Sequence, residues 1–162
     1  LSSIVIPEKV TNIAYQTFYG CTNLKTIKIG GSVKTVGEKS FAECKALESV
    51  ICMAENPPTA SSYAFENSYI EHVTLYVPDN SVNKYRSQEP WSKFGQVVIR
   101  KWIAGDANSN GVVDDADIAE VVAYLMGNPS INFDKDAADA NKDGIVNAAD
   151  IVKIVNIIYK PN

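Results

Sequence analysis

The chain has 162 residues, 46% of them hydrophobic and 21% charged, with a formal net charge of −4. This length allows one or two small domains with their own cores, and no run of eighteen apolar residues is present that would span a membrane. Residues 104–162 contain ten Asp and Glu and four Lys, which gives this part a net charge of −6 and leaves the earlier part a net charge of +2. A charge of +2 is too weak to predict nucleic-acid binding.

The first 53 residues repeat with a period of 23. Each unit begins Leu-x-x-Ile-x-Ile, continues with Val-x-x-Ile or Val-x-x-Val, and ends in a turn with Phe and Cys. The aligned sets are Leu1, Leu24 and Leu47; Ile4, Ile27 and Val50; Ile6, Ile29 and Cys52; Val10 and Val33; Ile13 and Val36; Phe18 and Phe41; Cys21 and Cys44. The period indicates a solenoid whose coils bury each other's apolar faces. Because Leu1 already lies inside a repeat, we expect the sequence to be a fragment.

The aligned cysteines have two interpretations. Cys21 and Cys44 should lie one above the other on adjacent coils, at a separation that would permit a disulfide. Side chains in such a ladder seldom reach the required torsion, so we expect buried free thiols that pack as small hydrophobic groups. Cys52 is expected in the core, and the single His72 on the surface.

The end of the repeats is rich in aromatic residues. An open solenoid end exposes apolar surface and unpaired strand edges, so we expect Trp91 and Phe94 to cover the last coil. A surface platform for a ligand is the alternative. Val97 to Ile99 are expected to form a last strand, and residues 101–104 a connector in which Trp102 and Ile103 pack against one domain or both.

Residues 106–117 and 139–150 contain one twelve-residue pattern written twice, with oxygen-bearing side chains at positions 1, 3, 5, 9 and 12 and glycine at position 6. Ca²⁺ takes six to eight oxygen ligands and binds loops of this spacing. An acidic, turn-rich linker is the alternative. The expected ligands are Asp106, Asn108, Asn110, Asp114 and Asp117, then Asp139, Asn141, Asp143, Asn147 and Asp150, with the backbone carbonyls of Val112 and Ile145 at position 7. The sequence therefore predicts two calcium ions.

A helix is expected after each loop, over about 116–126 and 149–159, but none before it. The apolar positions Ile118, Val121, Val122 and Leu125 recur as Ile151, Ile154, Val155 and Ile158, which predicts one core-facing stripe on each helix. Ile131 and Phe133 are expected to pack beneath the loops. Two short helices bury little surface, so we expect this half to depend on calcium for its fold.

These patterns resemble two known families. Residues 1–100, with their Phe-x-x-Cys turns and the segment around Leu75, Tyr85, Trp91 and Phe94, resemble the leucine-rich repeats of BspA-like bacterial surface proteins. Residues 105–160 resemble the type I dockerin domain. The resemblance implies a mixed fold: a leucine-rich-repeat solenoid with a cap over 1–100, a connector over 101–104, and an all-α, duplicated loop–helix domain with EF-hand-type calcium loops over 105–162.

The dockerin resemblance implies a cohesin-like protein partner. In dockerins the contacts come from loop positions 10 and 11 and from exposed helix residues, which here are Asp115, Ala116, Val122 and Ala123, then Ala148, Ala149, Val155 and Asn156. The clostridial modules carry polar pairs such as Ser-Thr, whereas Ala148 and Ala149 offer no side-chain hydrogen bonds. A more apolar contact is expected, either with an unfamiliar cohesin or with the protein's own repeats.

The sequence contains no Ser/His/Asp set, nucleophile elbow or phosphate loop, so we do not expect an enzyme. The leading expectation is a bacterial secreted or cell-surface interaction module. Its dockerin-like half docks to a partner, and its repeats offer an adhesion surface for a host or bacterial surface protein or a glycan. The alternatives are an accessory component of a polysaccharide-degrading extracellular complex, or a calcium-stabilised structural terminus packed on the repeats.

Overall fold

The structure is a computed structural model that describes residues 1–101, 103–130 and 132–160. It divides into two compact units, Leu1–Arg100 and Lys101–Asn162, which are described separately. The packing expected of Trp102 and Ile131 lies outside the described residues. Within those residues, no helix combines the length and apolar character needed to cross a membrane.

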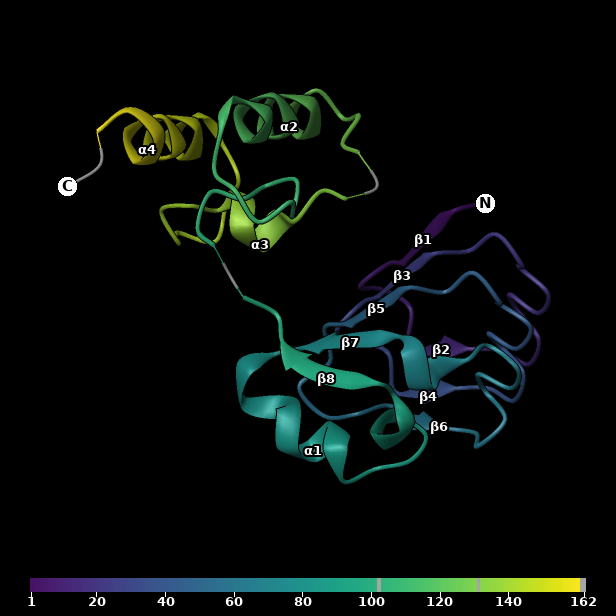
Figure 1. Cartoon of the computed structure of the whole chain (residues 1–162). Helices are drawn as coiled ribbons and strands as arrows, with labels where there is room; N and C mark the ends of the chain where they lie inside the picture. Colours follow the sequence, from purple (N-terminus) through teal and green to yellow (C-terminus); the bar gives the residue numbers. More distant parts are fainter. Residues whose placement is uncertain (102, 131, 161–162) are drawn as a thin grey trace. The chain divides into compact units, whose positions relative to one another are not determined.

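The first unit is a stack of coils with two parallel sheets (Figure 1). The larger sheet has the order β1 (Ser3–Ile6), β3 (Thr26–Ile29), β5 (Ser49–Cys52), β7 (Thr74–Val77) and β8 (Gln96–Ile99). The smaller sheet has the order β2 (Asn12–Ile13), β4 (Thr35–Val36) and β6 (Thr59–Ala60). Parallel coils with turns between them fit the predicted leucine-rich-repeat solenoid.

The sequence repeat sets the strand register. Ile4 pairs with Ile27, which pairs with Val50, as the period requires. The second and fourth residues of β3, β5 and β7 are buried, because alternate side chains point to opposite faces of a sheet. Leu1 was expected to face inward but is 72% exposed, because β1 has a neighbouring strand on one side only.

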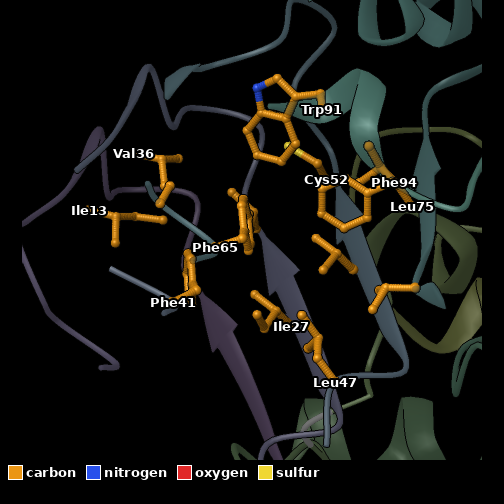
Figure 2. Packing of buried hydrophobic residues seen from close by; sticks show 14 of the residues in the cluster. Ile13, Ile27, Val36, Phe41, Leu47, Cys52, Phe65, Leu75, Trp91 and Phe94 are labelled. Atoms are coloured by element: carbon orange, nitrogen blue, oxygen red, sulfur yellow. The ribbon is translucent and has the colours of Figure 1, made fainter. Parts of the chain in front are cut away.

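The turns stack as regularly as the strands. The Phe18 and Phe41 amides donate 2.8 Å hydrogen bonds to the carbonyls of Ser40 and Ala64 on the next coil. The rings of Phe18, Phe41 and Phe65 form a column with centroids 5.3 and 5.4 Å apart. Figure 2 shows Phe41 and Phe65 in this column, with Trp91 and Phe94 beyond them. The repeated phenylalanine is therefore a continuous core element.

A group of short helices closes the last coil. The helices are η1 (Ile70–His72), η2 (Asp79–Ser81), α1 (Val82–Arg86) and η3 (Trp91–Lys93). Trp91 is fully buried, makes an edge contact with Phe65 and donates a 2.8 Å hydrogen bond from Nε1 to the Pro58 carbonyl. Phe94 is also buried and contacts Phe65 edge-on. Both rings therefore act as a cap and offer no exposed ligand platform.

All three cysteines are free thiols. Cys44 is buried, and its Sγ donates to the carbonyl of Phe18 at 3.4 Å. Burial raises the pKa of Cys44 to about 11 and also raises that of Cys52. The hydroxyl of buried Tyr85 lies between the Ala54 carbonyl and Cys52 Sγ, at 2.8 and 3.2 Å. Cys44 and Cys52 belong to the core, as the repeat alignment predicted, whereas Cys21, also expected to be buried, is only half-buried.

The second unit contains α2 (Asp115–Leu125), α3 (Lys135–Ala138) and α4 (Ala148–Tyr159). The two longer helices lie within one residue of the predicted ranges, whereas α3 was not predicted. Asp134 begins α3 by accepting hydrogen bonds from the amides of Asp136 and Ala137. Phe133 stacks on Tyr124 with ring centroids 4.5 Å apart. The core of this unit consists of Ala107, Val121, Ala138, Ala140, Val146 and Ile154.

The predicted helical stripes were too wide. Val121 and Ile154 are fully buried where α2 meets α4, and Ile118, Ile151 and Ile158 pack beside them. Val122, Leu125 and Val155, assigned to the same stripes, are instead exposed. Each helix packs against a single long partner helix, so only a narrow strip of its surface is covered. The exposed positions are therefore available for contact with another molecule.

Candidate metal-binding loops

The loop that precedes α2 is folded around its own side-chain oxygens. Asp106 accepts hydrogen bonds from the amides of Asn110 and Gly111, both at 2.9 Å. Asp117 reaches back from the helix to the amides of Asn108 and Asp114, at 3.0 and 2.9 Å. Loop positions 1 and 12 thus hold the backbone at both ends of the turn.

The loop that precedes α4 repeats this pattern. Asp139 accepts from the amides of Asp143 and Gly144, at 3.1 and 2.8 Å. Asp150 accepts from the amides of Asn141 and Asn147, at 3.2 and 2.9 Å. Gly111 and Gly144 have φ values of 91° and 87°, a conformation that L side chains rarely adopt. The two loops therefore share one local fold.

Each loop also begins its helix. Asp114 and Asn147, at loop position 9, are N-caps that accept from the amides of Ala116 and Ala149. Asp117 and Asp150 complete a capping box by accepting from the N-cap amide. A change at either position would therefore disturb the loop and the start of the helix together.

The donor set fits a cation bound by oxygen. Asp106 is 6% exposed and Asp117 and Asp150 are fully buried, yet none of these three carboxylates forms an ion pair with another described residue. Burial of an unpaired carboxylate is costly. Burial raises the pKa of Asp117, and the nearby charges of Asp106 and Asp114 raise it further, although hydrogen bonds from the Asp114 and Asn108 amides lower it.

Carboxylates alone do not complete either site. Within the described residues, no group of three or more His, Cys, Asp or Glu side chains is arranged to hold a metal. Asn108, Asn110 and Val112 would have to supply amide and carbonyl oxygens in the first loop, and Asn141, Ile145 and Asn147 in the second. Mixed carboxylate, amide and carbonyl oxygens are the set that calcium takes.

The residues expected to contact a partner lie mostly on the surface. Asp115, Ala116, Val122, Ala148, Ala149, Val155 and Asn156 are exposed, and Ala123 is half-buried. Sequence reasoning missed Val152 and Tyr159, each 61% exposed, which follow Ala148 at helical spacing and extend its face along α4. That spacing, applied from Ala148 onward, would have found both residues.

A repeat solenoid followed by a duplicated loop–helix unit defines a two-module interaction protein. A family model described as BspA type leucine rich repeat region (6 copies) matches residues 1–88, and one described as Dockerin type I domain matches residues 104–158. The chain belongs to the BspA-type leucine-rich-repeat family and carries a type I dockerin domain after its repeats. No curated protein matches it.

Membership of these families has direct consequences. Both domains are non-catalytic interaction modules. Type I dockerins bind calcium and take cohesin domains as partners, and both families occur in extracellular or cell-surface bacterial proteins. The chain is therefore a protein-interaction module.

Proposed function

We propose that this chain is a non-catalytic docking protein of the bacterial cell surface or secreted fraction. Its second unit binds two calcium ions and docks onto a cohesin-like domain, and its repeat unit offers a recognition surface. The observation that carries the proposal is the matched pair of loops, in which buried Asp106, Asp117 and Asp150 lack ion-pair partners among the described residues.

The residues that would hold the ions follow from the loop geometry. The first loop offers Asp106, Asn108, Asn110, Asp114, Asp117 and the Val112 carbonyl; the second offers Asp139, Asn141, Asp143, Asn147, Asp150 and the Ile145 carbonyl. Bound calcium supplies two positive charges that offset the repulsion among the carboxylates. The amide hydrogen bonds to positions 1 and 12 keep these oxygens directed into each turn.

The energetic effect of two such sites would be large for a unit of this size. We take a dissociation constant of about 10 μM, within the range for EF-hand sites. At about 1 mM calcium, each occupied site then raises the free energy of unfolding of the unit by about 2.7 kcal/mol. Small domains are stable by only about 5–15 kcal/mol in total. We therefore infer that the helix pair keeps its shape through calcium, which makes docking conditional on the ion.

The docking contact is proposed to be apolar. Val155, Val152 and Tyr159 lie along one exposed face of α4, with Ala148 and Ala149 at its start. This face has alanine where the clostridial modules carry a polar pair, so its partner must supply apolar surface. Buried aromatic and aliphatic contacts contribute most of the affinity at such interfaces.

The test is surface plasmon resonance of the full chain against a panel of type I cohesin modules, with calcium and with excess chelator. We expect binding in calcium only, and a loss of at least about tenfold in affinity for Val155→Asp, as expected for a charge placed in an apolar interface. Asn132→Asp adds the same charge at an exposed site outside α2 and α4 and is the matched control. Calcium binding without cohesin binding would favour the calcium-stabilised structural terminus.

Exposed tyrosines support a recognition role for the repeat unit. Tyr15, Tyr19, Tyr63 and Tyr69 lie on the turns and are all at least half exposed. The pKa of Lys45 is raised by its hydrogen bond to Glu43 and further by Tyr69 and Tyr19, which therefore lie near it. Tyrosine is enriched in protein-binding surfaces.

The glycan alternative has its own test on these tyrosines. Affinity electrophoresis in gels that contain soluble xylan or β-glucan would show a retarded chain. The retardation would be lost in Tyr19→Ala and Tyr69→Ala. Such a result would favour an accessory component of a polysaccharide-degrading complex.

A further inference from the structure

The two loops share a fold but differ in charge. Residues 106–117 contain four Asp and no basic residue, a net of −4, whereas residues 139–150 contain three Asp and Lys142, a net of −2. The second loop has Asp143 at position 5 where the first has Asn110. The first loop has two further carboxylates, Asp114 at position 9 and Asp115 at position 10, where the second loop has the uncharged Asn147 and Ala148. The first loop therefore attracts a cation more strongly.

Loop position 4 accounts for one unit of this difference. Ser109 and Lys142 occupy it, both exposed and with φ values of 59° and 61°. Ser109 donates a 3.4 Å hydrogen bond to Asp134 Oδ2, so a further carboxylate lies beside the first loop. The second loop has a lysine at the same place. Position 4 is not a ligand position, so its charge acts on the site without taking part in coordination.

The two loop entrances are held by different contacts: the second loop continues from α3, where the Asp139 amide donates to the Lys135 carbonyl at 3.0 Å, and the first loop is bonded to this segment from outside it. The Gly105 amide donates to the Ala137 carbonyl, and the Asp134 amide to the Ala107 carbonyl, both at 2.8 Å, which ties the loop entrance to the α3 segment. Asp106 is buried, whereas its counterpart Asp139 is half-buried. A buried site is screened less by salt.

Two oxygens of the second loop are engaged by side-chain amides. Asn141 Nδ2 donates to Asp143 Oδ2 at 2.9 Å, and Asn147 Nδ2 donates to the Ile145 carbonyl at 3.1 Å. Both acceptors belong to the expected ligand set. At position 9 the first loop has Asp114, a carboxylate with no N–H to donate. When the second loop closes on an ion, the hydrogen bond from Asn147 to the Ile145 carbonyl must therefore break or be redirected. The first loop has no such bond at position 9.

We infer that the two calcium sites are unequal and fill in order, the loop of Asp106–Asp117 first and the loop of Asp139–Asp150 second. This inference rests on the proposed calcium binding. A net difference of two unit charges within one loop, after screening, corresponds to about a tenfold difference in dissociation constant for a divalent ion. The second loop begins α4, which carries the proposed apolar face, so docking would follow the weaker site.

The order of filling can be read site by site on the intact chain. The amides of Gly111 and Gly144 donate to Asp106 and Asp139 at 2.9 and 2.8 Å, so each signal reports the ligand at position 1 of its own loop. In a calcium titration followed by ¹H–¹⁵N NMR, we expect the Gly111 signal to finish its change before the Gly144 signal. Simultaneous change, or the reverse order, would overturn the inference. No change at either glycine would reject calcium binding itself.

Substitutions at loop position 4 change the charge of either loop and leave all the proposed calcium ligands in place. Calorimetry with calcium should show a tight and a weak step in the wild type. Lys142→Ser should tighten the weak step by about threefold and Ser109→Lys should weaken the tight step by a similar factor, since each changes one charge. Ser109→Ala separates the lost hydrogen bond to Asp134 from the added charge. Two identical steps in the wild type, or no effect of either charge change, would contradict unequal sites.

Discussion

The hydroxyl of Tyr159 donates a 2.6 Å hydrogen bond to Asp115 Oδ1, so the last residue of α4 is tied to the first residue of α2. The internal repeat places Met126 and Ala148 at the equivalent positions, and these two side chains cannot form such a bond. The hydrogen bond to Asp115 raises the pKa of the Tyr159 phenol. The helix pair is therefore fastened differently at its two ends.

Removal of this hydroxyl should weaken the helix pair slightly. We expect Tyr159→Phe to lower the urea midpoint of the calcium-loaded second unit at pH 7. A raised folded pKa means that the neutral phenol contributes stability at pH 7 and loses it as the pH rises through that folded value. Tyr63→Phe, at an exposed tyrosine of the repeat unit, should leave the midpoint unchanged. Equal effects of the two variants would show that the bond contributes nothing.

Calcium removal should unfold one unit and spare the other. Helices α2 and α4, of 11 and 12 residues, lie beside the proposed sites, whereas the core of the repeat unit is built from its own apolar side chains. Circular dichroism with excess chelator should therefore lose most of the helical signal near 222 nm and keep the strand signal. Full helical signal in chelator would refute a calcium-dependent fold.

Phe41 is the middle ring of the aromatic column and is fully buried. Truncation would leave a cavity between the rings of Phe18 and Phe65. We expect Phe41→Ala to lower the free energy of unfolding of the repeat unit by about 3–5 kcal/mol, measured by urea denaturation. Phe41→Leu should cost less, because leucine fills part of the space. A loss below about 1 kcal/mol for alanine would mean that neighbouring coils close the gap.

The buried thiols should react slowly. Thiolate is the reactive form, and burial raises the pKa of Cys44 to about 11, so little thiolate exists at pH 8. Mass spectrometry after iodoacetamide treatment should show Cys21, which is half-buried, modified before Cys44 and Cys52. The reagent should modify all three equally in urea. A Cys21–Cys44 disulfide in non-reduced protein would contradict the free thiols.

The period of 23 predicted the coils because strand pairing leaves few alternatives: a slip of one residue would turn Ile27 outward. The prediction stops where the spacing changes. Ser49 pairs with Thr74, 25 residues on, so the unchanged period would misplace β7. One extra residue lies before β6, in the segment that contains Pro57 and Pro58, because Thr35 pairs with Thr59, 24 residues on. The other lies between β6 and β7. Turn geometry sets the length of both segments, and apolar periodicity carries no signal there.

The loops were predictable because their ligand positions double as local folding signals. Asp117 both caps α2 and closes its loop. This single side chain therefore allowed the loop and the first residue of the helix to be predicted with an error of one residue. Exposure was harder to predict. Val122 and Leu125 have helical spacing typical of a core, but only a facing element decides whether such residues are buried, and the described part of the second unit has none there. The four-residue helix α3 is too short to show a period.

Between Phe65 and the closing residues Trp91 and Phe94, the ring contacts change from stacked to edge-on. A following coil would need a flat phenylalanine face to continue the column, and it would meet ring edges instead. Evolution can therefore lengthen or shorten this protein by whole coils only on the amino-terminal side of Phe65. Such changes would alter the size of the repeat surface while leaving the helices that close the last coil unchanged.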